Sequence, residues 1–170
     1  MMDKSVIEFL EGVAAKTPTP GGGSVAALAG AISCSLAEMV CNLTIGKKKY
    51  ANVEEEIKEE GTKMREAREK FLQLVEEDAK AFDEVMRAYK GGGDEQKALK
   101  RASQVPYETA SLCSSIMNDL FIIAEKGNKN SITDAGVAAL MAHAAFHSAI
   151  LNVKINLKYI EAVSYTHLTL

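Results

Sequence analysis

The chain of 170 residues contains no tryptophan, and aromatic residues are sparse, with five phenylalanines and five tyrosines. Proteins that bind single-stranded nucleic acid stack the bases on aromatic side chains, so this composition argues against such a surface. The formal net charge of −3 is too small to indicate a strongly charged partner or wholesale binding of a phosphate backbone. We therefore expect no nucleic-acid partner.

Cysteine and proline are also scarce, with three residues of each. The cysteines are an odd number without CxxC spacing, which argues against a disulfide framework and for a reducing compartment, the cytoplasm. Cys34 and Cys41 are seven residues apart and share a helix face, which favours buried thiols. The few prolines, together with abundant alanine, glutamate, lysine and leucine, favour long helices over strands.

The start of the chain lacks the basic region and apolar run of a signal peptide. One long apolar stretch, from Val25 to Ile45, has the length needed to span a bilayer. It contains Glu38, Asn42 and several small residues, so we interpret it as a buried core helix and expect no membrane partner.

Helical periodicity runs through almost the whole chain, and no stretch shows a convincing strand pattern. Between about Asn52 and Tyr89, the series Ile57, Met64, Phe71, Asp78 and Val85 recurs every seven residues, which is typical of a bundle seam. The sequence therefore predicts an all-α, multihelical bundle with one very long helix. The expected helices span about residues 3–15, 24–46, 52–89, 94–104, 106–126 and 131–163.

Local signals set the expected helix boundaries. Asp3 is the expected N-cap of the first helix and Ser24 that of the second, while Pro106 predicts a kink or break around Gln104–Pro106. The residues expected on inner faces are Val6, Phe9, Leu10 and Val13 in the first helix and Val137, Leu140, Met141, Ala144 and Leu151 in the last. Residues 164–170 lose the helical pattern, so we expect one domain over residues 1–163, truncated at its C-terminal end, followed by a non-native tail.

The segment Pro-Thr-Pro-Gly-Gly-Gly-Ser at residues 18–24 is the sharpest candidate for a binding site. A glycine-rich turn that leads into a helix presents free N–H groups and the positive end of a helix dipole, which suits a carboxylate or a polar ring. It matches neither the P-loop nor the dinucleotide fingerprint. A plain helix start is the alternative, but three consecutive glycines favour function, because glycine permits positive φ and close backbone approach.

Asp78 is the second candidate, because a carboxylate in an apolar seam requires a partner, a cationic ligand or a raised pKa. A slightly rotated helix that leaves Asp78 at the edge is the alternative. Further polar groups are Lys48 and Lys49, which suit an anionic tail or a solvated loop, and Asn152 and Asn156, which suit a ligand or a contact between helices.

Asn128, Asn130 and Asp134 flank the start of the last helix, where helix capping explains part of the cluster. His143 and His147 have the i, i+4 spacing of a zinc pair. No glutamate lies between the two histidines and no third ligand is evident, so we expect no metal site.

Several motifs follow one another in the order found in a known family. They are the glycine turn at 18–24, Lys48-Lys49-Tyr50, Asp78 with Ala81-Phe82, Val105-Pro106, NKNSITDAGVAA at 128–139, and Asn152-Val153 with Asn156-Leu157. Over residues 3–162 the set resembles the cyclodeaminase domain of formiminotransferase-cyclodeaminase and the stand-alone bacterial methenyltetrahydrofolate cyclohydrolases. Thr133 departs from that pattern, because the family often has serine there.

The resemblance implies an intertwined homodimer that binds folate near the glycine turn. It implies one of two reactions: hydrolysis of 5,10-methenyltetrahydrofolate to 10-formyltetrahydrofolate, or cyclisation of 5-formiminotetrahydrofolate with loss of ammonia. Both pass near a cationic amidine-like centre that a buried carboxylate stabilises. No cofactor beyond the tetrahydrofolate substrate is expected.

The expected catalytic residues are Asp78, beside the cation or as a proton shuttle, and Asp134, which would orient the pterin or water. The expected substrate-binding residues are Pro20, Gly21, Gly22, Gly23, Ser24, Lys48, Lys49, Asn128, Asn130 and Asn152. Among these, Lys48 and Lys49 would meet the glutamate tail.

Two other classes of function are weighed against the enzyme. One is a non-catalytic folate-binding helical module, which has little need of the seam carboxylate Asp78. The other is a coiled-coil scaffold built on the 52–89 helix, which needs neither the glycine turn nor the clustered asparagines.

Overall fold

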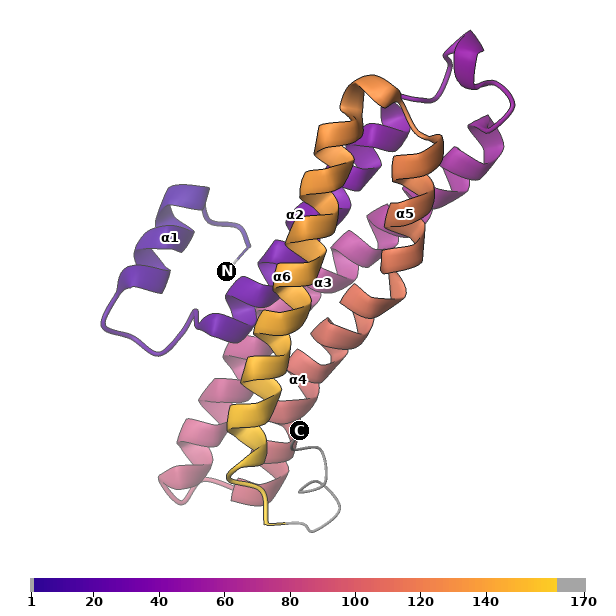
Figure 1. The fold of residues 1–170 in the computed structure, drawn as a ribbon. Coiled ribbons are helices and arrows are strands. Elements are labelled where there is room, and N and C mark those ends of the chain that lie inside the picture. The colour runs from indigo at the N-terminus through magenta and orange to yellow at the C-terminus, as the bar shows by residue number, and fades with distance from the viewer. Residues whose placement is uncertain (1, 162–170) are drawn as a thin grey trace.

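The structure is a computed structural model that describes residues 2–161. Four long helices alternate in direction and form the bundle, and two shorter helices lie at its margins (Figure 1). The helices are α1 (Val6–Ala14), α2 (Gly22–Asn42), α3 (Glu54–Tyr89), α4 (Glu95–Ser115), α5 (Met117–Lys126) and α6 (Ile132–Leu157), with 3₁₀ turns η1 (Lys48–Tyr50) and η2 (Lys129–Ser131). Within residues 2–161 no strand occurs, and the predicted all-α fold is confirmed.

Helix α2 lies at the centre of the bundle, where it packs against α3 and α6. Glycines allow the close approach to α3. A Cβ atom built on Gly30 would lie 2.6 Å from the ring of Phe71, and one on Gly61 would lie 3.2 Å from Cβ of Cys41. The buried thiols of Cys34 and Cys41, whose pKa burial raises to about 12, lie in this core as expected.

Two helical segments, Gly22–Asn42 and Lys129–Leu157, are long and apolar enough to cross a membrane by length and composition alone, a test that core helices of soluble proteins also pass. Most of the apolar window in α2 is buried inside the bundle, as expected of a core helix, whereas only 28% of the window that includes α6 is buried.

The heptad seam of α3 faces the core as predicted. Ile57, Met64 and Phe71 are fully buried, and Val85 is nearly so. Asp78 continues this series toward the C-terminal part of α3 and lies half-buried beside the start of α2. The sequence pattern therefore gave both the length of α3 and the inward direction of Asp78.

The predicted N-caps are wrong. Helix α1 is capped by Ser5, whose hydroxyl accepts a hydrogen bond from the backbone N–H of Glu8 while the Glu8 carboxylate accepts one from the backbone N–H of Ser5. This reciprocal pair satisfies two backbone donors, which Asp3 does not do. Helix α2 begins one turn earlier than predicted, after Gly21, so Ser24 lies inside the helix.

Of the predicted kink or break at Pro106, the break does not occur, because α4 continues through it and ends at Ser115. Proline removes the N–H that would bond the carbonyl of Ala102, four residues earlier. The side chain of Asn156 on α6 supplies the missing donor, with its Nδ2 atom 2.7 Å from that carbonyl oxygen. The actual interruption is at Ile116, between α4 and α5.

The predicted inner face of α6 is wrong as well. The buried residues are alanines at a spacing of three and four, namely Ala135, Ala138, Ala142, Ala145 and Ala149. Leu140 and Leu151 are instead 70% and 68% exposed, and Val137 is 47% exposed. Small side chains allow α6 to lie close to α2, which leaves the larger apolar side chains outside.

Helix α1 shows a similar discrepancy. Phe9 is buried, whereas Val6 and Leu10 are 76% and 58% exposed. At the other end of the chain, α6 ends at Leu157, before the predicted limit at Val163. Val163 and the predicted tail at 164–170 lie outside the described residues.

Candidate functional site

A cavity of about 490 Å³ opens where α2 begins, between α3 and the C-terminal half of α6. Pro18, Thr19 and the glycines 21–23 of the turn form one side, and α3 and α6 contribute polar side chains that include Asp78 and Asn152. We call this cavity the glycine-turn site. It brings together residues from α2, α3, α4 and α6, which are far apart in the sequence. The predicted site residue Pro20 lines a separate hollow against α1 instead.

The glycines bring the backbone of α2 against these polar side chains. A Cβ atom on Gly23 would lie 2.0 Å from Oδ1 of Asp78, and one on Gly22 would lie 3.4 Å from both the Oδ1 and Nδ2 atoms of Asn152. Any larger residue at position 23 would have to displace the carboxylate. The close backbone approach predicted for the turn is therefore present, whereas the positive φ it would permit is not adopted at residues 21–23.

Asp78 is held by hydrogen bonds from the buried residue Ser24. The hydroxyl of Ser24, which is 0% exposed, donates to Oδ2 of Asp78 at 2.8 Å. Burial raises the pKa of the Asp78 carboxyl above its ordinary value, and the Ser24 hydrogen bond opposes that rise. Within residues 2–161 no ion pair is formed by Asp78, so its charge is available to a cationic ligand.

The two asparagines of α6 have different environments. Asn156 uses its Nδ2 atom to bond the backbone of α4, as described above, and so connects two helices. Asn152 donates from Nδ2 to the carbonyl oxygen of Ser148 on its own helix at 2.8 Å, and its amide lies over Gly22. Asn152 is therefore the asparagine placed to meet a ligand at the glycine turn.

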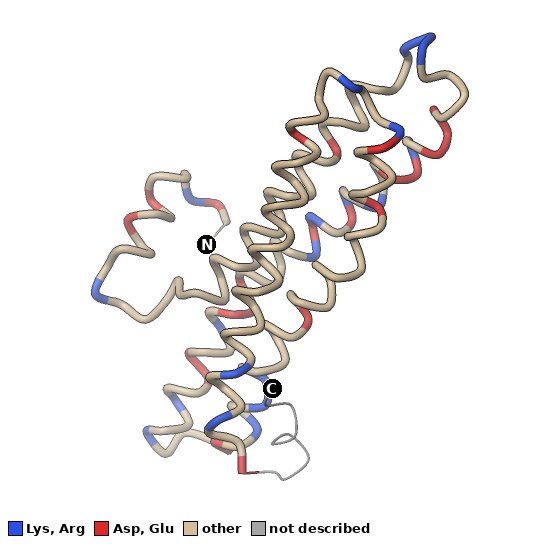
Figure 2. The backbone as a smooth tube through the Cα atoms, in the orientation of Figure 1, with Lys and Arg blue, Asp and Glu red and all other residues tan. Residues whose placement is uncertain are grey.

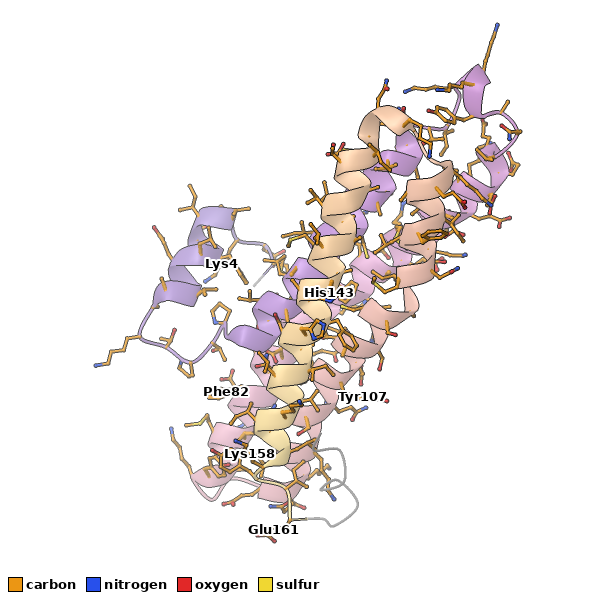
Figure 3. The ribbon with its side chains drawn as sticks, in the orientation of Figure 1. Lys4, Phe82, Tyr107, His143, Lys158 and Glu161 are labelled. Carbon is orange, nitrogen blue, oxygen red and sulfur yellow. The ribbon has the colours of Figure 1, made fainter. Side chains whose placement is uncertain are left out.

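Apolar and aromatic side chains complete the wall of the glycine-turn site. Phe82 on α3 lies below the start of α2 in the view of Figure 3, and Tyr89 and Tyr159 also line the cavity. These rings provide flat surfaces for a heterocycle. Sequence reasoning missed both tyrosines as site residues, because Tyr89 also fits the seam of α3 and Tyr159 lies beyond the end of α6.

The remaining predicted site residues lie at the other end of α2. Helix α2 has 21 residues, so its ends are about 30 Å apart. Beyond its C-terminal end lie Lys48 and Lys49 in η1, close to the turn between α5 and α6 (Figure 1). We call this the lysine region. The structure does not bring it to the glycine-turn site within one chain.

Asn128 is the centre of a closed hydrogen-bond network in the lysine region. Its backbone N–H donates to the hydroxyl of Thr44 at 2.8 Å, and its Nδ2 atom donates to the carbonyl oxygen of Leu43 at 2.9 Å. Its Oδ1 atom accepts from the backbone N–H of Asn130 at 3.1 Å. The hydroxyl of Tyr50 accepts from the backbone N–H of Lys129 at 3.0 Å. These bonds fasten the 128–131 turn to the end of α2.

The other candidates of this region are more accessible. Lys48 and Lys49 are exposed, and Nζ of Lys49 lies 5.5 Å from the centre of the Tyr50 ring. Asp134 is half-buried in the first turn of α6, where the positive end of the helix dipole favours a carboxylate. Asp134 lies about one length of α2 away from the cavity at Asp78, so the two predicted catalytic residues are not neighbours in one chain.

The structure defines an all-α protein with a cavity at a glycine turn. The profile of the family described as Formiminotransferase-cyclodeaminase matches residues 5–169. The chain therefore belongs to the formiminotransferase-cyclodeaminase family, and the resemblance inferred from the ordered motifs is confirmed.

Two curated relatives and one solved structure illustrate the relationship. A methenyltetrahydrofolate cyclohydrolase of Methylorubrum extorquens is 44% identical over 167 residues, which cover 92% of this chain and 80% of that protein. The formimidoyltransferase-cyclodeaminase of Rattus norvegicus is 31% identical over 169 residues, which cover 93% of this chain but 31% of that longer protein. The crystal structure of formiminotetrahydrofolate cyclodeaminase from Thermotoga maritima matches with a TM-score of 0.93 and 42% identity, over 98% of this chain and 84% of that chain.

Proposed function

We propose that the chain is a folate one-carbon enzyme that hydrolyses 5,10-methenyltetrahydrofolate to 10-formyltetrahydrofolate at the glycine-turn site. The observation that carries the proposal is the Asp78 carboxylate, which is half-buried in the cavity without a cationic partner among residues 2–161. The 44% identity to a methenyltetrahydrofolate cyclohydrolase over most of both chains favours this reaction.

The charge of the substrate suits this carboxylate. The methenyl bridge carries a positive charge delocalised over N5, the bridging carbon and N10. A carboxylate in a partly desolvated cavity attracts such a cation more strongly than it would in water. The aromatic wall with Phe82 and Tyr89 receives the pterin, and the amide of Asn152 over Gly22 bonds its polar edge.

The raised pKa also suits Asp78 as a proton shuttle, because a general base works best when its pKa approaches the working pH. In the first step a water oxygen bonds to the bridging carbon, and Asp78 accepts one proton from that water. In the second step the bond between this carbon and N5 breaks, its electron pair stays on N5, and Asp78 returns the proton there. The formyl group remains on N10. The second proton of the water leaves to solvent.

A cyclodeaminase is the second candidate, favoured by the match to the Thermotoga maritima protein. In that reaction N10 attacks the carbon of the protonated formimino group, and the C=N double bond becomes a single bond to an amino group. That bond then breaks, and its electron pair leaves with ammonia. Asp78 would accept the proton of N10 and deliver it to the departing nitrogen. The same carboxylate serves both reactions because both have an amidine-like cation at the same place.

Absorbance measurements test the proposal and separate the two reactions. The purified chain is expected to accelerate the loss of the methenyltetrahydrofolate absorbance, with 10-formyltetrahydrofolate as the product. Formation of the methenyl compound from 5-formiminotetrahydrofolate would instead identify the cyclodeaminase. A folded chain that binds methenyltetrahydrofolate but turns over neither substrate would contradict both and leave the folate-binding module.

We further propose that the chain forms a homodimer through α2 and α6. Each helix carries exposed apolar residues along one face, at a spacing of seven on α2, which is typical of helices that pack against further helices. The residues are Val25, Ile32 and Met39 on α2, and Val137, Leu140, Leu151 and Ile155 on α6. Figure 2 shows that long parts of both helices carry no charged residue. We propose that a second copy of the chain covers these apolar faces with its own identical faces.

A dimer would also account for the separated site residues. The exposed apolar residues of α1, which projects from the bundle in Figure 1, would pack on the second copy. If the two copies run in opposite directions, the lysine region of one chain approaches the glycine-turn site of the other. Lys48, Lys49, Asn130 and Asp134 would then reach a bound folate, with the lysines at its glutamate tail.

Light scattering of the purified chain tests this assembly. We expect the mass of a dimer for the wild type and the mass of a monomer for Leu140→Asp combined with Leu151→Asp. Tyr107→Asp, at an exposed apolar position of α4, is the control and should remain dimeric. A wild-type chain that is monomeric at micromolar concentration would contradict the proposal.

The three cysteines are buried and free, which agrees with a reducing compartment, so we place the protein in the cytoplasm. Folate is the proposed small-molecule partner. We propose no nucleic-acid partner. We also propose no membrane partner, because packing of α6 on a second copy of the chain would cover the exposed apolar face of this helix.

A further inference from the structure

Two histidines on α6 face one another outside the glycine-turn site. The Nε2 atoms of His143 and His147 are 3.1 Å apart, and their ring centres are 4.4 Å apart. Both side chains are exposed, and Figure 3 shows His143 near the middle of α6. The two residues are one helical turn apart, so a single helix fixes their separation.

This separation is that of two ligands on one metal ion. Imidazole nitrogens bind zinc at about 2.0–2.1 Å, so two of them at tetrahedral or right angles lie roughly 2.8–3.4 Å apart. Without a metal, one Nε2–H donates to the other Nε2 atom. An ion takes the place of that hydrogen when both rings carry their proton on Nδ1.

A neighbouring aromatic ring contacts the ring of His147, and no charged side chain of the described residues lines the hollow beside the pair. The ring of Phe146 contacts that of His147 edge-on, with centres 5.3 Å apart. A hollow of about 200 Å³ beside the pair is lined by Met117 and Cys113, whose sulfur atoms are soft potential ligands. Within residues 2–161 no group of three or more histidine, cysteine or acidic side chains is placed to hold a metal. The pair would therefore bind as two ligands. It lies between Leu140 and Leu151 of the proposed dimer surface, so water or groups of the second copy would complete the coordination.

We propose that His143 and His147 form a bidentate site for a late first-row divalent transition metal ion, such as Zn²⁺ or Ni²⁺. This revises the expectation from sequence, which rested on the lack of a third protein ligand. An i, i+4 chelate needs only two ligands when the helix fixes their geometry. The proposal does not depend on the folate reaction, because its readout is metal binding.

Calorimetric titration of the untagged, reduced chain with ZnCl₂, and separately with NiCl₂, tests the site. One ion per chain is expected. His143→Ala and His147→Ala should each weaken binding at least tenfold, because either change removes the chelate. Thr133→Ala, at another exposed position of α6, is the matched control and should bind like the wild type. Circular dichroism of each variant confirms that α6 still forms.

A second readout is thermal unfolding, in which a bound ion stabilises the folded chain. Zn²⁺ should raise the Tm of the wild type and of Cys113→Ala, but not that of the double histidine variant. A stoichiometry of one ion per two chains that is lost with either histidine substitution would also support the histidines as ligands. It would place the histidine pair at the contact with a second copy of the chain. Unchanged affinity in both histidine variants would overturn the proposal, as would binding that Cys113→Ala abolishes and the histidine variants retain.

Discussion

The two ends of α2 carry similar polar residues with opposite outcomes. In the lysine region, Asn128 uses its backbone N–H, its Nδ2 atom and its Oδ1 atom in hydrogen bonds to neighbouring segments. In the glycine-turn site, Asp78 accepts hydrogen bonds from Ser24 only among residues 2–161, and its carboxylate also lines a cavity. The two polar clusters look alike in the sequence but differ in the structure. The hydrogen-bonding groups of Asn128 are bonded within the protein, whereas the charge of Asp78 is left for a ligand.

Asp78→Asn should have the largest effect on the glycine-turn site. Loss of the carboxylate should lower the turnover of methenyltetrahydrofolate by about 10²–10³-fold, a size typical of removing one preorganised group that stabilises charge in the transition state. Initial rates measured by absorbance check this. Full turnover in the variant would contradict the role of Asp78.

The same variant should not unfold more easily at neutral pH. A carboxyl whose folded pKa is raised contributes stability below its unfolded pKa and loses that contribution as pH rises through the folded pKa. Ionisation of the buried Asp78 as pH rises through its folded pKa is therefore unfavourable to the fold, and the neutral amide removes that penalty. Thermal unfolding at pH 7 is the measurement, and a clear fall in Tm would indicate a structural role.

Gly23→Ala should damage both the fold and the reaction. The added Cβ would lie 2.0 Å from Oδ1 of Asp78, so either α2 or the carboxylate must move. We expect a loss of about 1–3 kcal/mol in the free energy of unfolding and a marked fall in turnover. Gly136→Ala is the matched control, because a Cβ there meets no atom within 4 Å. Equal effects of the two substitutions would contradict the close contact at Gly23.

Asn128→Ala probes the opposite region and should affect stability alone. It removes the hydrogen bonds that its amide makes to Leu43 and Asn130 in a buried place, at an expected loss of about 1–3 kcal/mol. Urea unfolding measures this loss. Turnover per folded molecule should stay near that of the wild type, and a large fall in kcat with unchanged stability would move Asn128 into the site.

Ser24→Ala should shift the pH dependence of the reaction. The Ser24 hydroxyl lowers the pKa of Asp78, so its removal raises that pKa further. The loss of activity on acidification should then begin at a higher pH, and kcat should fall by about two- to tenfold, the worth of one hydrogen bond. A pH profile with an unmoved acid limb would show that Asp78 does not carry the titrating proton.

Lys48→Ala combined with Lys49→Ala should have the smallest effect. Both side chains are exposed, so they can contribute only screened attraction to an anionic tail. We expect a several-fold rise in KM for a polyglutamylated folate, with unchanged kcat and no change for the monoglutamate. An equal rise for both substrates would argue against contact with the tail.

Part of this architecture follows from the sequence. The heptad series of α3 predicts a long helix with Asp78 directed inward, because burial on one face needs only a periodic pattern. The close approach at Gly23 can also be predicted, since consecutive glycines lack side chains and so allow another group to contact the backbone. The pairing of the glycine turn with Asp78 in one site came from the family resemblance, and no periodicity shows it.

Other features depend on partners that lie far away in the sequence. Pro106 is accommodated inside α4 because Asn156, fifty residues later, replaces the lost donor. The inner face of α6 was misassigned because its alanines fit against α2, while its leucines are left for a surface outside the chain. Amphipathic patterns identify a face that is buried, but not which neighbour buries it.

The most direct test is the crystal structure of the Asp78→Asn variant with 5,10-methenyltetrahydrofolate bound. The account predicts the methenyl bridge beside residue 78 at the start of α2, with the pterin against Phe82. A folate bound instead among Lys48, Asn128 and Asp134, with the cavity at the glycine turn empty, would contradict it.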